Sequence, residues 1–160
     1  MSDFNTNQFS MSAKPGQVDL STTSNDDLFT CRYNPEATAE LRLVDGAGVM
    51  LKDLSTDDSA GPPIVDVLPD DNDAPFGIKI FTTKENNSVP GDIVQIATDG
   101  AVVFMKASGA IARGNTLAFV NATPGSVIVQ TSEDKIGLAL DHAEDTELVR
   151  VLVKAEAVSE

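Results

Sequence analysis

Short apolar runs separated by turn residues fill the chain from residue 39 onward. Valine and isoleucine are prominent in these runs, and β-branched residues favour pleated strands. The runs recur about every dozen residues, a spacing typical of a β-barrel or β-sandwich and not of alternating strands and helices. Strands are therefore expected at residues 39–44, 64–68, 76–81, 93–97, 102–105, 116–120, 126–130, 136–140 and 147–153.

Two turn signals refine this pattern. Asp99-Gly100 lies between the runs 93–97 and 102–105, and Asp-Gly readily adopts the positive φ angles of a two-residue hairpin turn. We expect these two runs to pair as a β-hairpin. The region before the first run leaves an alternative open, because Asn34-Pro35-Glu36 can also cap a short helix.

A weak internal repeat divides the β-rich region. It pairs residues 48–52 with 109–113, 63–67 with 126–129, 76–80 with 136–140, and 92–97 with 147–153. Two related β units, sharing one core or packed side by side, explain this order. Chance similarity among valine-rich strands is the alternative. The expected fold class is mainly β, a small barrel-like or sandwich-like body with repeat units at 39–98 and 99–154.

The first 30 residues differ from the rest, because Ser, Thr, Asn, Asp and Gln dominate and the apolar residues are isolated. We expect residues 1–30 to form an extended arm ahead of a β domain at 31–160. Such an arm can order against a partner, where a few apolar anchors supply the contacts. A frayed chain end without a role is the alternative. The candidate contact residues are Phe4, Phe9, Met11, Val18 and Leu20.

Length and charge limit the partners. A chain of 160 residues can form one domain with a full core or two small β subdomains. Its formal net charge of -14 repels phosphate backbones and anionic lipid, so we expect no nucleic-acid partner. The N-terminus lacks a secretory signal, and no window approaches the roughly 18 apolar residues of a membrane span. We therefore expect no membrane partner.

The search for catalytic, cofactor-binding and metal-binding residues leads us to expect none of them, and no enzyme activity. His142 is the sole histidine, and a lone loop histidine is more often solvated than catalytic. Cys31 is the sole cysteine, so the chain can form no intrachain disulfide and no cysteine-based zinc site. Residues 70–73 are acidic, but the glycine and glutamate of a calcium loop are missing at the required spacing. Residues 46–48 lack the third glycine of a dinucleotide fingerprint.

The order of turns and strands in residues 75–154 carries a resemblance. The matching segments are Phe76-Gly77-Ile78, Pro90-Gly91-Asp92, Asp99-Gly100-Ala101, Gly114-Asn115 and Ile136-Gly137-Leu138. This order resembles the decoration (cement) proteins of tailed-phage capsids. The resemblance implies a small β protein on the capsid exterior, made in the host cytoplasm and often trimeric. It also implies binding to the major capsid protein and fastening of neighbouring capsomers against internal DNA pressure.

A second class of function stays open, that of a β-sandwich binding module for carbohydrate or for adhesion on a tail or cell surface. Such modules usually present aromatic platforms. This chain has no tryptophan and a single tyrosine, Tyr33, which disfavours that class.

Overall fold

The computed structural model describes residues 15–19, 23, 27–38, 43–52, 61–67, 75–80, 87–120, 125–131 and 135–156. Twelve strands and no α-helix are present in these residues. The strands are β1 (Leu28–Tyr33), β2 (Leu43–Val44), β3 (Gly48–Leu51), β4 (Ile64–Val67), β5 (Gly77–Lys79), β6 (Asn87–Ser88), β7 (Ile93–Ala97), β8 (Val102–Ala107), β9 (Thr116–Phe119), β10 (Ser126–Val129), β11 (Lys135–Ala139) and β12 (Leu148–Glu156).

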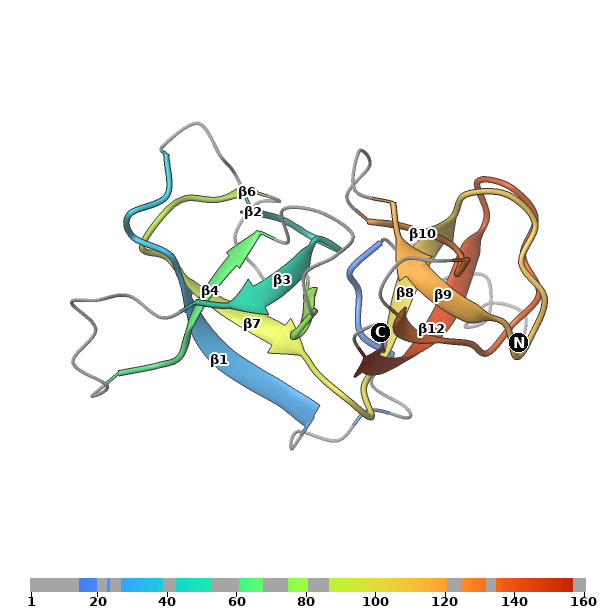
Figure 1. Cartoon of the computed structure of the whole chain (residues 1–160), viewed down its shortest axis with the longest axis horizontal. Helices are drawn as coiled ribbons and strands as arrows, with labels where there is room; N and C mark the ends of the chain where they lie inside the picture. The colour runs from blue at the N-terminus through green and yellow to red at the C-terminus, as the bar shows by residue number, and fades with distance from the viewer. Residues whose placement is uncertain are drawn as a thin grey trace, which may run out of the picture.

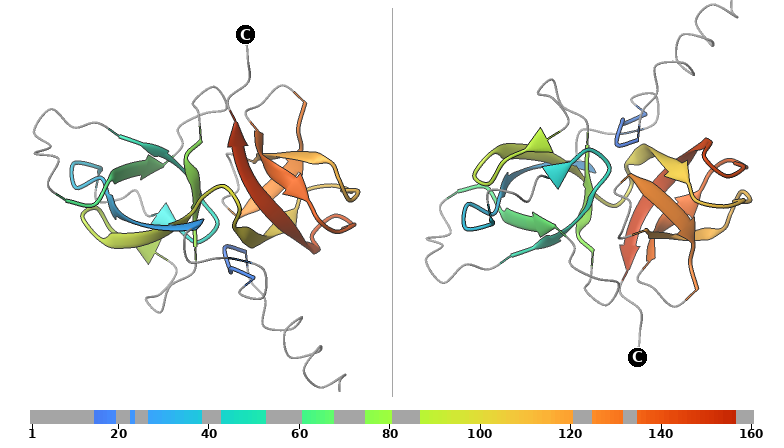
Figure 2. Two further views of the ribbon diagram at one scale, coloured as in Figure 1. Left: turned by 90° about the horizontal axis from the view of Figure 1, so that it is seen from below. Right: turned by 90° about the horizontal axis from the view of Figure 1, so that it is seen from above.

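Ten of these strands close into two barrels. The first barrel contains β1, β4, β3, β5 and β7 in that order, and the second contains β10, β8, β12, β11 and β9. The strands β2 and β6 form a separate pair beside the first barrel. The barrels lie side by side along the long axis of the molecule (Figures 1 and 2). The mainly β fold with two units is confirmed.

The two barrels have the same topology. In each, the first strand pairs antiparallel with the last and parallel with the third, as β1 does with β7 and β4, and β8 with β12 and β10. In each, the second strand pairs antiparallel with the third and the fourth. The chain is therefore a tandem repeat of one five-stranded barrel, in which β1, β3, β4, β5 and β7 correspond to β8, β9, β10, β11 and β12.

The repeat expected from sequence matches this correspondence in three of its four parts. Three expected pairs agree with the strand correspondence, namely 63–67 with 126–129, 76–80 with 136–140, and 92–97 with 147–153. The pairing of 48–52 with 109–113 is wrong, because β3 corresponds to β9 (Thr116–Phe119). Residues 109–113 instead form a turn, with one isolated bridge from Ile111 to Ala143.

The expected hairpin at Asp99-Gly100 is also wrong. A turn does form, with a hydrogen bond from the Ala101 amide to the Thr98 carbonyl (3.0 Å) and a φ of 99° at Gly100. Asp99 has no positive φ, whereas a type I′ hairpin turn needs one at both central residues. The strands before and after this turn diverge, and β7 joins the first barrel while β8 joins the second.

The recurring apolar-glycine-apolar motif has a steric cause. Gly77 and Gly137 occupy corresponding places in β5 and β11, close to the backbone of the neighbouring strands β7 and β12. A Cβ at Gly77 would collide with the carbonyl oxygen of Ala97, and one at Gly137 with that of Leu152. Only glycine permits this close approach of two strands.

Two apolar clusters stabilise the barrels. The first cluster includes Cys31, Tyr33, Val49 and Ile96 from strands of the first barrel and Leu43 from β2, all fully buried. The larger cluster fills the second barrel and also takes in residues from the outer face of the first, namely Ile78, Ile80 and Ala97. The second barrel therefore shares its core with the wall of the first.

Parts of the sequence behave differently from the pattern-based expectation. The strand β1 (Leu28–Tyr33) begins inside the stretch expected as an arm. Asn34-Pro35-Glu36 forms a turn, in which the Asn34 side chain accepts a hydrogen bond from the Glu36 amide (2.9 Å), and no helix follows in residues 34–38. The acidic residues 70–73 lie outside the described residues.

We predict that Gly137→Ala lowers the free energy of unfolding by about 3 kcal/mol. The added methyl group would collide with the Leu152 carbonyl and force the backbones of β11 and β12 apart. Gly61→Ala is the matched control, since a Cβ at Gly61 meets nothing within 4 Å. Urea denaturation followed by circular dichroism measures both changes. Equal stability of the two variants would contradict the steric explanation.

Candidate functional site

The contact between the barrels joins a barrel mouth to a barrel wall. Phe119 at the end of β9 lies at the mouth of the second barrel and is only 9% exposed. A Cβ at Gly48 on β3 would lie 2.5 Å from the Phe119 ring. The missing side chain at Gly48 therefore leaves the space that the ring occupies. We call this contact, with the neighbouring Ile78 and Ala97, the seam.

Three glycines bring backbone segments together at one end of the seam. A Cβ at Gly46 would lie 2.6 Å from the Gly125 Cα, and one at Gly16 would lie 2.6 Å from the Gly46 nitrogen. The Gly125 amide donates a hydrogen bond to the Gly46 carbonyl (3.2 Å). All three residues have positive φ angles between 84° and 88°, which side chains disfavour. The N-terminal segment, the first barrel and the second barrel thus meet at this glycine junction.

A buried ion pair fixes the turn that carries Gly46. Lys79 on β5 points into the first barrel, is fully buried, and pairs with the carboxylate of Asp45, which is 7% exposed. The backbone reinforces the pair, since the Gly46 amide donates to the Lys79 carbonyl (2.7 Å) and the Lys79 amide donates to the Ala47 carbonyl (2.9 Å). Removing one partner of a buried pair leaves an uncompensated charge, which is strongly destabilising. The position of the glycine junction therefore depends on this pair.

Residues 15–19, the N-terminal strip, add to the edge of β8. The Gly16 amide donates to the Phe104 carbonyl, the Phe104 amide donates to the Gln17 carbonyl, and the Asp19 amide donates to the Val102 carbonyl, each at 2.8 Å. Val18 forms an antiparallel bridge with Val103 and packs against the second core. The strip lies beside the seam (Figure 2). It covers the beginning of β8, because β10 pairs with that strand only at Lys106 and Ala107, and an unpaired strand edge is left open to solvent or to another chain.

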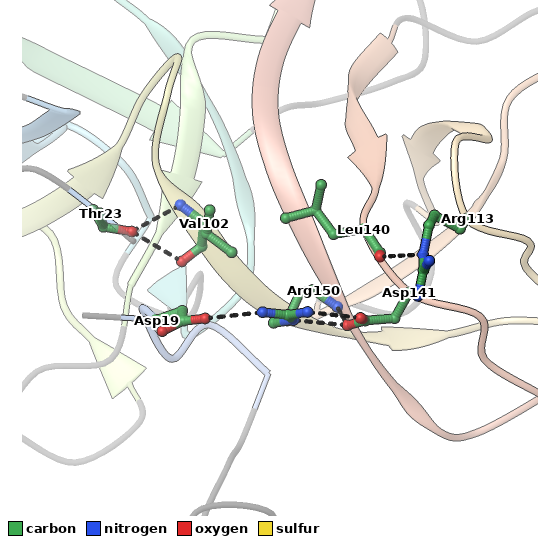
Figure 3. A network of polar contacts seen from close by, with 7 residues as sticks. All are labelled: Asp19, Thr23, Val102, Arg113, Leu140, Asp141 and Arg150. Atoms are coloured by element: carbon green, nitrogen blue, oxygen red, sulfur yellow. Dashed lines mark hydrogen bonds and ion pairs between the residues drawn. The ribbon is translucent and has the colours of Figure 1, made fainter. Parts of the chain in front are cut away.

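Polar contacts from β12 and β8 hold Asp19, at the end of the strip, and Thr23, which follows it in the chain (Figure 3). The Arg150 guanidinium donates two hydrogen bonds to Asp141, at 2.9 and 2.8 Å, and lies 3.5 Å from the Asp19 carboxylate. Thr23 accepts a hydrogen bond from the Val102 amide (2.9 Å). The side-chain hydrogen bonds from Arg150 hold the pKa of Asp141 below its usual range, and Asp141 in turn raises the pKa of Arg150.

Of the five apolar residues expected to contact a partner, the structure describes Val18 alone. Val18 belongs to the strip and is partly buried against the second core, so it holds the strip to the body. Phe4, Phe9, Met11 and Leu20 lie outside the described residues.

Four large apolar side chains that the sequence pattern did not single out are exposed among the described residues. They are Phe29 (45% exposed), Leu51 (51%), Ile93 (58%) and Ile128 (39%). Phe29 packs edge-on against Phe76, with ring centroids 5.8 Å apart. Three of the four, Phe29, Leu51 and Ile93, lie on strands of the first barrel. Phe29 and Leu51 share the parity of buried residues on their strands and still reach solvent, which strand alternation alone does not reveal.

The residues considered for catalysis and for carbohydrate binding differ in their exposure. His142 is exposed, and its Nδ1 accepts a hydrogen bond from the Arg113 amide (3.4 Å). Tyr33 is fully buried, so its ring offers no binding platform. Cys31 is also buried, and burial raises the pKa of its thiol to about 11. Among the described residues, no three His, Cys, Asp or Glu side chains gather as metal ligands.

The part of the chain that the structure describes contains no helix of the length and apolarity needed to cross a membrane.

A solved structure with a similar fold is described as head fiber gp8.5 N base in bacteriophage phi29. The match covers 83% of this chain and 98% of that chain, with a TM-score of 0.50 and 16% sequence identity. It supports the two-unit β fold over most of the described body. No family description matches the sequence, and no curated protein matches it.

We predict that Asp141→Asn removes an acid-dependent part of the stability. Because the pKa of Asp141 is lowered in the folded state, its contribution is fully present at neutral pH and is lost as the pH falls below about 4. The pair is partly exposed, so the contribution is at most about 1 kcal/mol. Urea denaturation from pH 7 to pH 3 should show a shallower loss for the variant than for the unchanged protein. Parallel curves would refute the assignment.

Proposed function

We propose that this chain is a non-enzymatic structural virion protein that binds the outer surface of a phage capsid. It stabilises the shell by cementing neighbouring capsomers through the major capsid protein. The observation that carries the proposal is the similarity of fold to the base of a phage head fiber. The turn-and-strand order of residues 75–154, which resembles that of capsid decoration proteins, supports it independently.

The geometry suits a mechanical role. The second barrel shares its core with the wall of the first, so the two barrels form a stiff body and not two beads on a linker. A stiff body that touches two capsomers resists their separation, whereas a flexible linker extends. Several copies joined as a homotrimer multiply weak contacts into high avidity. The net charge of -14 keeps free copies soluble before assembly.

The arm provides an attachment element in this proposal. Residues 1–14 precede Pro15, which lies at the glycine junction, where a Cβ at Gly125 would approach its side chain at 3.0 Å. The first described residue, Pro15, therefore lies at the glycine junction. Phe4, Phe9 and Met11 are the anchors that we assign to the capsid, while Val18 belongs to the strip on β8.

We predict that the purified protein binds expanded, mature capsids and raises the temperature at which the shells break. Cosedimentation measures binding, and a dye that reports released DNA measures shell disruption during heating. Shells left undecorated are the control. Binding without a change in disruption temperature would indicate a passive attachment base and would contradict cementing. Absence of binding would contradict the whole proposal.

We predict that deleting residues 1–14 lowers capsid occupancy while the body keeps its stability. The deletion ends before Pro15, so the strip and its hydrogen bonds to β8 remain. A matched variant, Phe9→Ser with Met11→Ser, keeps the arm length and removes two anchors. Quantitative gel analysis of purified particles measures occupancy, and thermal unfolding checks the body. Unchanged occupancy in both variants would exclude the arm from attachment.

A further inference from the structure

The seam joins two different surfaces of one repeated barrel. The second barrel contributes its mouth, with Phe119 and Gly125, and the first barrel contributes its outer wall, with Gly46, Gly48 and Ile78. Each barrel also has the kind of surface that the other uses in the seam, because the two share one topology. The molecule therefore has one further mouth on the first barrel and one further wall on the second.

The mouth of the first barrel is exposed. Leu51 corresponds to Phe119, because Leu51 is the Cα partner of Val65 as Phe119 is of Val127. Leu51 is 51% exposed, whereas Phe119 is 9% exposed. Pro63 corresponds to Gly125, because the Pro63 carbonyl accepts a hydrogen bond from the Arg32 amide and the Gly125 carbonyl accepts one from the Lys106 amide (2.9 Å in each). Pro63 is exposed and Gly125 is buried.

The wall of the second barrel is open as well. Leu138 is the Cα partner of both Thr116 and Leu152, as Ile78 is of Gly48 and Ala97 in the first barrel. We call Thr116, Leu138 and Leu152 the second row. Ile78 and Ala97 are fully buried in the seam, but all three residues of the second row are partly exposed.

A glycine marks the same place on both walls. The Gly114 amide donates to the Ala139 carbonyl (2.8 Å), as the Gly46 amide donates to the Lys79 carbonyl (2.7 Å). Their φ angles are 90° and 85°. Gly46 packs against Gly125, whereas a Cβ at Gly114 would meet nothing within 4 Å. Gly114 thus corresponds to Gly46 of the glycine junction, but no other described segment packs against it.

The side chains of the two open surfaces compensate in size. In the seam, a large Phe119 lies over a Gly48 without a side chain. If the open mouth docked on the second row, Leu51 would face Thr116. Leu51 is smaller than Phe119, and the Thr116 side chain would fill part of the space that the Phe119 ring occupies above Gly48. Leu51 on the mouth is exposed, and Leu138 and Leu152 on the wall are partly exposed. Apolar side chains left accessible on a surface can mark an interface with another molecule.

We propose that the open mouth and the second row bind each other between copies of this chain. The first-barrel mouth of one copy, with Leu51 and Pro63, docks on the second-barrel wall of the next, with Gly114, Leu138 and Leu152. The contact continues the seam from one chain to the next, and its two sides differ, so it is a head-to-tail interface. The proposal depends on the repeat and is independent of the proposed capsid role.

The test uses full-length protein and two variants, Leu51→Glu and Leu138→Glu, each of which removes one side of the interface. Analytical ultracentrifugation should show the unchanged protein well above the 16.8 kDa of one chain and each variant at that mass. An equimolar mixture of the variants should form a species of two chains, because each retains the side that the other lacks. If the interface were symmetric and required the same residue from both copies, the mixture would stay monomeric. That result would contradict a head-to-tail interface.

Ile128→Asp is the matched control. Ile128 is exposed (39%), and it corresponds to Asp66, since Ala118 pairs with Ile128 as Met50 pairs with Asp66. This variant should assemble like the unchanged protein.

Circular dichroism checks that each variant folds, and Leu152→Lys replaces Leu138→Glu if that variant does not. An unchanged protein that stays monomeric at its highest soluble concentration, or a Leu51→Glu variant that still assembles, would overturn the proposal.

Discussion

The packing of Phe119 against Gly48 is the contact on which the two-barrel body depends. A five-stranded barrel of this size has a small interior, and the open mouth of the second barrel would expose its core. The wall of the first barrel closes that mouth with Ile78 and Ala97. The neighbouring features follow from this contact. The glycine junction allows the backbones to approach, and the buried Lys79–Asp45 pair holds the turn that carries Gly46.

The strand pattern could be predicted because alternation and turn residues are local properties. The run 93–97 became β7 with the same bounds, and most other runs became strands that differ by one or two residues at their ends. The strand β1 was not predicted, since its sequence, Leu-Phe-Thr-Cys-Arg-Tyr, follows a long polar stretch and contains only two β-branched or aliphatic residues. Its pairing with β7 and β4 supplies the stability that its own composition lacks.

The pairing of strands was harder to predict than their presence. Asp99-Gly100 does turn the chain, but the φ of Asp99 decides whether the flanking strands pair or separate, and sequence does not give that angle. The seam is likewise hidden, because Phe119 and Gly48 meet only through the relative placement of the barrels. One signal was available in the sequence. Glycine recurs at corresponding positions of the two units, as in Gly77 and Gly137, and such recurrence marks backbone contacts that alternation alone does not.

The burial of Cys31 has a practical consequence for chemical use of the protein. The single thiol of the chain lies inside the first barrel with its pKa raised to about 11, and only an accessible thiolate attacks alkylating reagents efficiently. The native surface therefore presents no cysteine thiol to maleimides. A cysteine introduced at an exposed turn position such as Ala110 would accept one label per copy, with no need to remove the natural residue, and would make the protein a site-selective carrier for dyes or peptides.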